Sequence, residues 1–357
     1  MLITGHTGFL GSWLALWLKG LRAEVLGYAR EPETPPDLYT LAKVADGMES
    51  ILDDMRDFKR LLSAFDAFQP EVVIHLAGQS ILGRAERKPR LTFNVNVQGT
   101  LNVLEAVRRT ESVKAAAFAS SGMAYENREW GLGYREADPL GGNEPLGASQ
   151  AAAEMAVAAY RQSCTGEPRG RGVGLATFRM GNVIGGGDFG EARLLPDAVR
   201  AATTDTKLAL RAPGARRPWV HVLDALSGVL VLASKLFEAP EAVSGAWNIG
   251  PDVAAAVTVS ELAARFFMLL GKGGVDDASG FLGEEMPPPW VLRLASEKAR
   301  DALGWCSVLG VEEAVAATAE WYRYMLLENG DARHLCLKNI GEYVETAVAK
   351  GIWWAES

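Results

Sequence analysis

The chain has 357 residues, of which 48% are hydrophobic and 22% charged, a composition typical of a globular protein of about two domains. The formal net charge of -8 gives no basic stripe for nucleic acid, which argues against a nucleic-acid-binding protein. The three cysteines, Cys164, Cys306 and Cys336, lie far apart, which argues against a zinc cluster or a disulfide framework and indicates a cytoplasmic protein.

The apolar stretch near the front of the chain is not expected to be a signal peptide or a membrane span. Residues 9–18 are apolar, but Gly11 and Ser12 interrupt them and no basic segment precedes them, unlike in a signal peptide. No apolar run approaches the length of a membrane span. Met1 already falls inside the first predicted strand, which leaves open whether the natural chain begins earlier.

The first 120 residues alternate short aliphatic runs with helical stretches. The predicted strands are residues 1–4, 24–28, 72–76 and 115–120. The predicted helices are residues 12–20, 57–68 and 94–110, with apolar residues three and four apart. This alternation predicts the α/β class: a Rossmann-like, doubly wound parallel sheet covered by helices on both faces. We expect residues 1–180 to form a dinucleotide-binding domain.

The second half of the chain is less regular. A helix over residues 147–163 leads into a strand over residues 173–179, and Gly185, Gly186 and Gly187 then break the pattern. Further helices are predicted at residues 194–203, 222–236, 259–270, 296–303 and 311–326. We expect residues 181–357 to form mainly a smaller C-terminal substrate-binding lobe, with some segments returning to the Rossmann sheet.

A glycine turn stands between the first predicted strand and the first predicted helix. Its spacing is Gly-x-x-Gly-x-x-Gly, and its members are Gly5, His6, Thr7, Gly8, Phe9, Leu10 and Gly11. Such glycines allow a tight turn and let phosphate oxygens approach bare backbone N–H groups at the positive end of a helix. The context on both sides therefore predicts a dinucleotide site, whereas His6 is expected to support the loop.

The segment after the second strand does not choose between NAD and NADP. An acidic residue there commonly binds the adenosine ribose of NAD. Here Arg30 and Glu31 follow Tyr28 and Ala29, and Arg30 is equally suited to a ribose 2'-phosphate or to a solvated surface position. We expect NAD, with NADP left open.

Several blocks, in the same order along nearly the whole chain, resemble the CDP-glucose 4,6-dehydratase family of extended short-chain dehydrogenases. They are residues 4–9 with 11–14, then 44–48, 125–130, 138–142, 181–188, 217–221 and 245–248. The resemblance implies an NAD-dependent protein that acts on a nucleotide sugar, with CDP as the implied nucleotide. Members of this family oxidise the sugar at C4, eliminate water across C5 and C6, and return the hydride to C6.

The resemblance also assigns binding residues. Around the cofactor it implies the glycine turn together with Asp54, Met55, Leu76, Ala77, Gly78, Gln79 and Asn96. Around the nucleotide diphosphate it implies Asn182, Arg193, Arg217 and His221. The planar guanidinium of arginine suits this role because it matches the geometry of phosphate oxygens. His75, in contrast, lies inside an apolar run and is expected to be a packed core histidine.

The catalytic residues of the family are absent. Its tyrosine, and the lysine four positions later, correspond here to Leu146 and Gln150. Its aspartate and lysine for the elimination step correspond to Gly122 and Met123. Each group lost is commonly worth about a hundredfold to ten-thousandfold in rate, so standard dehydratase chemistry is not expected.

Four polar residues remain as candidates for catalysis, namely Ser120, Ser121, Tyr125 and Glu126, each of which has a structural alternative as an anchor of its loop. The favoured hypothesis is a nucleotide-sugar-modifying enzyme with altered chemistry. The alternatives are a non-catalytic binding subunit or regulator, and an enzyme acting on a non-sugar substrate. The family pairs through two long helices, expected here at residues 94–109 and 147–163. The alanine-rich composition of the second favours close helix packing and hence a homodimer.

Overall fold

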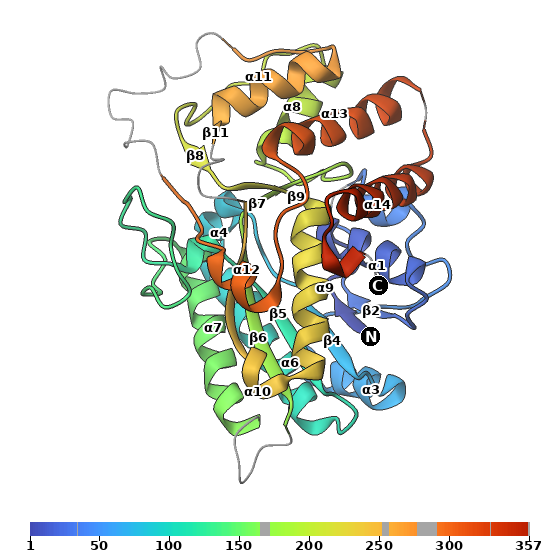
Figure 1. Ribbon diagram of the computed structural model, residues 1–357, viewed down its shortest axis with the longest axis vertical. Coiled ribbons are helices and arrows are strands. Elements are labelled where there is room, and N and C mark those ends of the chain that lie inside the picture. Colours follow the sequence, from blue (N-terminus) through green and yellow to red (C-terminus); the bar gives the residue numbers. More distant parts are fainter. Residues whose placement is uncertain (34, 165–171, 252–256, 277–290, 329, 356–357) are drawn as a thin grey trace.

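The computed structural model describes residues 1–33, 35–164, 172–251, 257–276, 291–328 and 330–355. Seven parallel strands form the main sheet, in the order β10-β6-β5-β4-β1-β2-β3. Their bounds are β1 Leu2–Thr4, β2 Leu26–Ala29, β3 Glu49–Leu52, β4 Val72–His75, β5 Ala115–Ser121, β6 Gly174–Met180 and β10 Gly245–Ile249. The predicted doubly wound parallel sheet is thus confirmed (Figure 1).

Helices cover both faces of the sheet because successive side chains of each strand point to opposite sides. On one face, Leu2 and Val73 pack in a cluster with α3 (Phe58–Phe68), α6 (Gly99–Arg109) and α7 (Pro145–Cys164). On the other face, Ile3 and Ile74 belong to a larger cluster with α1 (Phe9–Gly20) and α9 (Val222–Glu238). Both layers are visible in Figure 1.

Short local signals fix the ends of these helices. Asp57 caps α3 by accepting a hydrogen bond from the backbone N–H of Arg60. Helix α6 continues directly from a π-helical turn, η1 (Asn94–Gln98), so the single helix predicted over residues 94–110 is in fact two kinds of helix. The remaining short elements of this part are α2 (Leu38–Leu41), α4 (Leu82–Arg87), α5 (Pro89–Phe93) and the 3₁₀ turn η2 (Gly122–Ala124).

The second lobe lies at the carboxyl end of the sheet, in the upper part of Figure 1. Its helices are α8 (Leu194–Thr203), α11 (Val259–Leu270) and α13 (Val311–Leu327), and α11 packs against the other two. A capping box at Thr258 starts α11, and Gly271, with φ +75°, ends it. Two small sheets join the lobe to the main sheet, pairing β7 (Asn182–Ile184) with β9 (Trp219–His221) and β8 (Arg216–Arg217) with β11 (Val257–Thr258).

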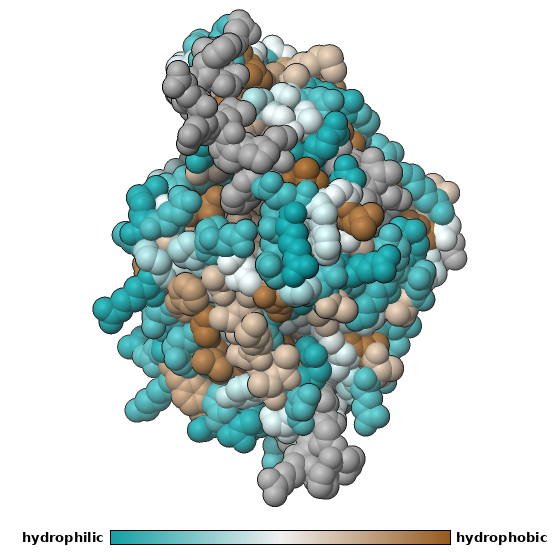
Figure 2. Space-filling view, turned by 90° about the vertical axis from the view of Figure 1, so that its left-hand side faces the viewer, coloured by the Kyte–Doolittle hydropathy of each residue, from teal (hydrophilic) through white to brown (hydrophobic). Residues whose placement is uncertain are grey.

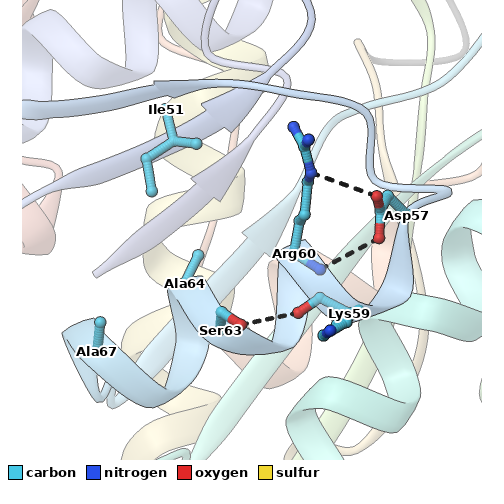
Figure 3. A pocket seen from close by; sticks show the side chains of 7 residues that line it. All are labelled: Ile51, Asp57, Lys59, Arg60, Ser63, Ala64 and Ala67. Atoms are coloured by element: carbon cyan, nitrogen blue, oxygen red, sulfur yellow. Dashed lines mark hydrogen bonds and ion pairs between the residues drawn. The ribbon is translucent and has the colours of Figure 1, made fainter.

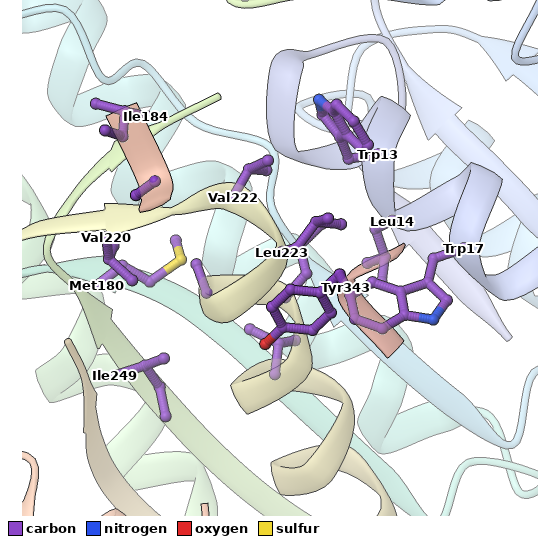
Figure 4. Packing of buried hydrophobic residues seen from close by; sticks show 14 of the residues in the cluster. Trp13, Leu14, Trp17, Met180, Ile184, Val220, Val222, Leu223, Ile249 and Tyr343 are labelled. Atoms are coloured by element: carbon purple, nitrogen blue, oxygen red, sulfur yellow. The ribbon is translucent and has the colours of Figure 1, made fainter. Parts of the chain in front are cut away.

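The last long helix, α14 (Ala332–Ala349), was not predicted from the sequence and packs against α1. Its Tyr343 meets Trp17 of α1 edge to face, with 5.6 Å between the ring centres (Figure 4). The Tyr343 hydroxyl donates a 2.8 Å hydrogen bond to the buried carboxylate of Asp224 at the start of α9. The end of the chain therefore helps to close the core around α1 and α9. Two other short helices, α10 (Pro240–Val243) and α12 (Glu297–Leu303), flank β10.

Candidate active site

The glycine turn after β1 has the geometry of an anion cradle. Gly5 has φ +81°, and its carbonyl accepts a 3.0 Å hydrogen bond from the N–H of Gly8. A Cβ on Gly11 would lie 2.1 Å from that carbonyl oxygen, so only glycine allows α1 to approach the turn this closely. A Cβ on Gly8 would meet only that same oxygen, at 3.4 Å, so the space in front of Gly8 is open.

Helix α1 begins at Phe9 without a side-chain cap and without an acidic residue in its first turn. Its first N–H groups and the positive end of its dipole therefore face the open space beside Gly8. Phe9 and Leu10 are half-buried, as is Thr7, whose hydroxyl donates to the carbonyl of Arg30 at 2.8 Å. The arrangement fits a pyrophosphate.

His6 holds the turn in place through contacts with β3 and with Tyr39. Its Nε2 atom lies 2.7 Å from Ser50 Oγ on β3, and its ring packs against Tyr39. Burial lowers the pKa of His6 to about 4, so the ring is neutral at physiological pH. His75 is likewise buried, between the hydroxyls of Thr4 and Thr100, as expected of a core histidine.

Acidic groups surround Arg30 at the end of β2. Its Nε lies 4.0 Å from Asp54 and its Nη1 lies 3.3 Å from Glu33. Asp54 also takes a 2.6 Å contact from Arg56, and this hydrogen bond lowers the pKa of the Asp54 carboxyl. A ribose 2'-phosphate at this position would face two carboxylates as well as Arg30, an environment better suited to the uncharged 2'-hydroxyl of NAD.

The segment that follows β4 is held in place by Asn96. The side chain of Asn96 accepts from the N–H of Gln79 at 2.8 Å and donates to the carbonyl of Gln79 at 3.0 Å. It also donates to Ser149 Oγ on α7 at 2.9 Å. Leu76, Ala77 and Gly78 lie next to the turn: a Cβ on Gly5 would be 2.7 Å from Ala77 N. Met55, buried after β3, packs beneath η1 and α6 against Gly99.

Leu146 and Gln150 lie one helical turn apart at the start of α7. Leu146 is only 4% exposed, and Gln150 is half-buried. Glu144 holds this end of the helix by accepting hydrogen bonds from the N–H groups of Leu146 and Gly147, at 2.6 and 2.7 Å. Neither side chain at this point of the site can exchange a proton near neutral pH.

The neighbouring 3₁₀ turn is apolar as well. A Cβ on Gly122 would lie 3.1 Å from a methyl carbon of Leu294, so this glycine packs directly against a leucine. Met123 packs against a buried cluster that includes Leu294 and Tyr134. A Cβ on Gly147 would lie 2.3 Å from the carbonyl of Met123, which places η2 in contact with the first turn of α7.

The four polar candidates for catalysis differ in their surroundings. Ser120 is buried and donates a 2.5 Å hydrogen bond to Glu154, and Ser121 is half-buried and accepts from the N–H of Met123 at 3.1 Å. Tyr125 is 1% exposed, and burial raises its pKa to about 12, which disfavours proton transfer at neutral pH. Glu126 is exposed and pairs with Arg128.

A buried ion pair lies directly behind Ser120 and Tyr125 and was not predicted from the sequence. Arg179 of β6 donates to both carboxylate oxygens of Glu154 on α7, at 2.7 and 2.6 Å. The same guanidinium donates to the Tyr125 hydroxyl at 2.6 Å, and that hydroxyl donates to Asn248 on β10 at 2.8 Å. This network joins three strands to α7 and forms the rigid back of the site.

The residues implied for the nucleotide diphosphate come from the second lobe. Arg193, just before α8, contacts both carboxylate oxygens of Asp188 at 3.0 Å and donates to Ser80 Oγ at 2.8 Å. Burial lowers the pKa of Arg217. His221 is buried, its pKa is lowered to about 4 by burial, and it caps α9. Asn182 is half-buried and begins β7. The hydrogen bond from Arg193 to Ser80 places Arg193 at the junction of the two lobes.

A shallow surface hollow lies away from these residues. It is lined by Ile51 of β3 and by α3, including Arg60, which pairs with Asp57 (Figure 3). Because this hollow is at the outer edge of the sheet, it is separate from the glycine turn.

Among the described residues, no cluster of three His, Cys, Asp or Glu side chains could hold a metal ion. In the part of the chain that the structure describes, no helix is long and apolar enough to cross a membrane.

Comparison with known proteins agrees with this geometry. Residues 1–250 match the model of the NAD dependent epimerase/dehydratase family. The chain is 38% identical over 347 residues to CDP-glucose 4,6-dehydratase of Salmonella typhimurium strain LT2, covering 96% of this chain and 95% of that protein. It is 28% identical over 206 residues to CDP-paratose 2-epimerase of Salmonella typhi, covering 53% of this chain and 59% of that protein.

Solved structures show the same architecture. UDP-glucose 4-epimerase of Thermus thermophilus, in complex with NAD, superposes with a TM-score of 0.76 at 26% identity, over 90% of this chain and 98% of that one. The dTDP-glucose 4,6-dehydratase of Bacillus anthracis shares the fold, with a TM-score of 0.75 at 21% identity, over 92% and 97% of the two chains. The chain belongs to the NAD dependent epimerase/dehydratase family.

Proposed function

We propose that this protein binds NAD and a nucleotide sugar, with CDP as the favoured nucleotide, and acts on that sugar by a chemistry other than standard 4,6-dehydration. One observation carries the proposal. The uncapped start of α1 and the open space at Gly8 fit a dinucleotide, whereas the first turn of α7 presents Leu146 and Gln150 where the reaction needs proton-exchanging groups.

The cofactor fits the residues present at the carboxyl edge of the sheet. The glycine turn and the first N–H groups of α1 would bind its pyrophosphate, and Asp54 and Arg30 lie where its adenosine ribose would be held. Gly78 and Gln79, fixed by Asn96, would line its nicotinamide half. NAD supplies a hydride acceptor when it is bound. The 38% identical Salmonella enzyme, named for CDP-glucose, supports a cytidine nucleotide as the second ligand.

The chain's own residues would bind and orient the sugar nucleotide rather than move its protons. Arg193 and Arg217 would neutralise the diphosphate, with Asn182 and His221 beside it. Leu146, Met123 and Gly122 would form an apolar wall at the proposed reaction centre, since Leu146 is buried and Met123 packs against a buried apolar cluster. Ser121 is the polar candidate that we favour beside that wall, because it caps η2 by accepting a hydrogen bond from the N–H of Met123. We assign residues 1–180 mainly to the cofactor and residues 181–357 mainly to the substrate.

Ligand binding tests the proposal directly. We expect NAD and CDP-glucose each to raise the melting temperature of the purified protein, since a ligand at a hundred times its Kd stabilises the folded state by about 2.7 kcal/mol. NADP is expected to give a smaller shift because of Asp54 and Glu33 around Arg30. Differential scanning calorimetry over a series of ligand concentrations measures these shifts. No shift with any dinucleotide would refute the proposal.

A second function is favoured by the same apolar wall: a non-catalytic subunit or regulator that binds the nucleotide sugar without converting it. Incubation with a broad set of nucleotide sugars, followed by chromatography, separates the two, because binding without consumption identifies the regulator. If NAD raises the melting temperature but cytidine nucleotides do not, the result favours the third alternative, an enzyme that acts on a non-sugar substrate. The unpaired cysteines Cys306 and Cys336 support a cytoplasmic location for any of these.

We also propose a homodimer formed through α6 and α7. Figure 2 views the side of the molecule that carries α7, and apolar side chains gather there. Met155 of α7 is 60% exposed, and Leu91 and Phe93 of the adjacent α5 are 36% and 38% exposed. Exposed apolar patches of this kind mark protein interfaces.

Met155→Glu is expected to convert the dimer to monomer, because it places a charge in an interface that would be apolar. Light scattering at micromolar concentration measures the mass. Met268→Glu, at a methionine on α11 in the other lobe that is 73% exposed, is the matched control and should leave the dimer intact. A monomeric unmodified protein would contradict this prediction.

A further inference from the structure

A chain of alternating charges crosses the carboxyl edge of the sheet above the glycine turn. It runs from Asp54 to Arg30, then to Glu33, Arg84 and Glu191. Arg84 Nη1 contacts Glu33, and Arg84 Nη2 lies 3.1 Å from Glu191 Oε1. We call the three residues Glu33, Arg84 and Glu191 the strap.

The topology places the strap over the proposed cofactor site. Glu33 follows β2 and Arg84 follows β4, and these two strands are the neighbours of β1 in the sheet. In a parallel sheet, the carboxyl ends of neighbouring strands lie at the same edge. An ion pair between these two segments therefore passes across the turn that follows β1.

Close contacts on both sides of the turn support this placement. Thr7 donates a hydrogen bond to the carbonyl of Arg30, three residues before Glu33. On the opposite side, a Cβ on Gly5 would lie 2.7 Å from Ala77 N, in the segment that leads to Arg84. Gly8 nevertheless remains exposed, so the strap leaves space above the turn.

Glu191 extends the strap to the second lobe and is held there firmly. Arg200 of α8 donates to the carbonyl of Gly190 at 2.9 Å, and the Tyr322 hydroxyl of α13 donates to the carbonyl of Asp188. Because the loop that bears Glu191 is fixed to the lobe, the Arg84–Glu191 contact ties the lobe to the first domain.

We propose that the strap closes over the bound dinucleotide and that its two ion pairs slow the release of the dinucleotide. This inference rests on the proposed function, since it requires a dinucleotide at the glycine turn. Individual exposed ion pairs are weak, each worth up to a few-fold in an equilibrium. A side chain such as Arg84, which is 23% exposed and contacts two carboxylates, adds more than an isolated pair.

The rate of dinucleotide release distinguishes a strap from simple charge repulsion, because the two predict changes of opposite sign when the glutamates are neutralised. Glutamates near a pyrophosphate repel it, so neutralising them should slow dinucleotide release if charge alone matters. If they act as supports of the strap, neutralising them should speed release instead. Glu33→Gln and Glu191→Gln are therefore informative, whereas a change of Arg84 would also remove a positive charge that attracts the phosphates.

The experiment loads the purified protein with radiolabelled NAD and follows its loss after a large excess of unlabelled NAD is added. We expect Glu33→Gln and Glu191→Gln each to speed release about two- to fivefold, with the difference from the unmodified protein shrinking in high salt. Glu342→Gln is the matched control, because Glu342 forms an exposed ion pair with Lys338 on α14. This variant should release NAD at the rate of the unmodified protein. Melting curves of the ligand-free variants verify that they fold.

Unchanged or slower release in both strap variants would overturn the strap while leaving the proposed cofactor intact. A protein that retains no labelled NAD at equilibrium would instead overturn the proposed function, and the strap with it. The two failures are therefore distinguished by the amount of NAD bound before the chase begins.

Discussion

Purified protein supplied with NAD and CDP-glucose is expected to form the 4-keto-6-deoxy sugar at least about 10⁴-fold more slowly than the Salmonella CDP-glucose 4,6-dehydratase under the same conditions. Under the proposed function, two proton-transfer groups are missing, at Leu146 and at the Gly122–Met123 pair, and each is commonly worth at least about a hundredfold. Chromatographic detection of the product measures the rate. Turnover comparable to that of the Salmonella enzyme would refute our interpretation of these positions.

The double variant Leu146→Tyr with Gln150→Lys refines this prediction. These positions lie one turn apart on the same face of α7, and the supporting contacts of Ser149 with Asn96 are already present. A lysine there would lower the pKa of a neighbouring phenol, so that it takes the proton of a sugar hydroxyl. We expect CDP-glucose to reduce bound NAD in this variant, seen as NADH absorbance, without forming the dehydrated product.

Gln150→Lys alone is the control for the double variant and should give no NADH, because Leu146 accepts no proton. Dehydrated product from the double variant would show that a group other than Gly122 and Met123 performs the elimination, and Ser121 would be the first residue to test. Absence of NADH, in a double variant that still binds both ligands, would show that the sugar does not reach α7.

Arg179→Met is expected to lower the free energy of unfolding by about 3–5 kcal/mol, because it leaves the carboxylate of Glu154 buried without its partner. The side chains of Arg179 and Glu154 are 3% and 4% exposed, so water cannot replace the lost hydrogen bonds. The Tyr125 hydroxyl and the carbonyl of Glu136 lose donors in the same step. Urea unfolding measures the loss.

Lys338→Met is the control, because Lys338 forms an exposed pair with Glu342 and its loss should change stability by less than about 0.5 kcal/mol. The double variant Arg179→Met with Glu154→Leu should regain part of the loss, since no unpaired charge remains buried. A loss below about 1 kcal/mol for Arg179→Met would show that the buried carboxylate is protonated or hydrated instead.

The sequence predicts the sheet well where strands are apolar and poorly where they are not. The β1–glycine turn–α1 unit stood out because its aliphatic strand and apolar helix flank the glycines directly. Strand β3 was missed because it lies at the edge of the sheet and carries Glu49 and Ser50, so it lacks an apolar run. Strand β10 was noted as a family motif but not as a strand, since its Gly245 and Asn248 disfavour strand formation.

Prediction of the candidate site from the sequence is limited by how far apart its residues lie along the chain. Local motifs are readable because their members are close in sequence, as in the glycine turn. The Glu154–Arg179 pair joins a helix to a strand 25 residues later, and each charge looks like an ordinary interruption of an apolar pattern. The strap joins residues 33, 84 and 191, whose proximity depends on the strand order. Long-range pairs of this kind require the three-dimensional arrangement before their roles become visible.

The late position of β10, α9 and α14 in the chain affects how the protein is made. Strand β10 completes the parallel sheet beside β6, and α14 contributes Tyr343 to the core around Trp17. A nascent chain leaving the ribosome therefore leaves the part of α1 that packs against α14 uncovered until nearly the whole polypeptide has been synthesised. Chaperone contact during translation is thus most needed by the part of the molecule that emerges first.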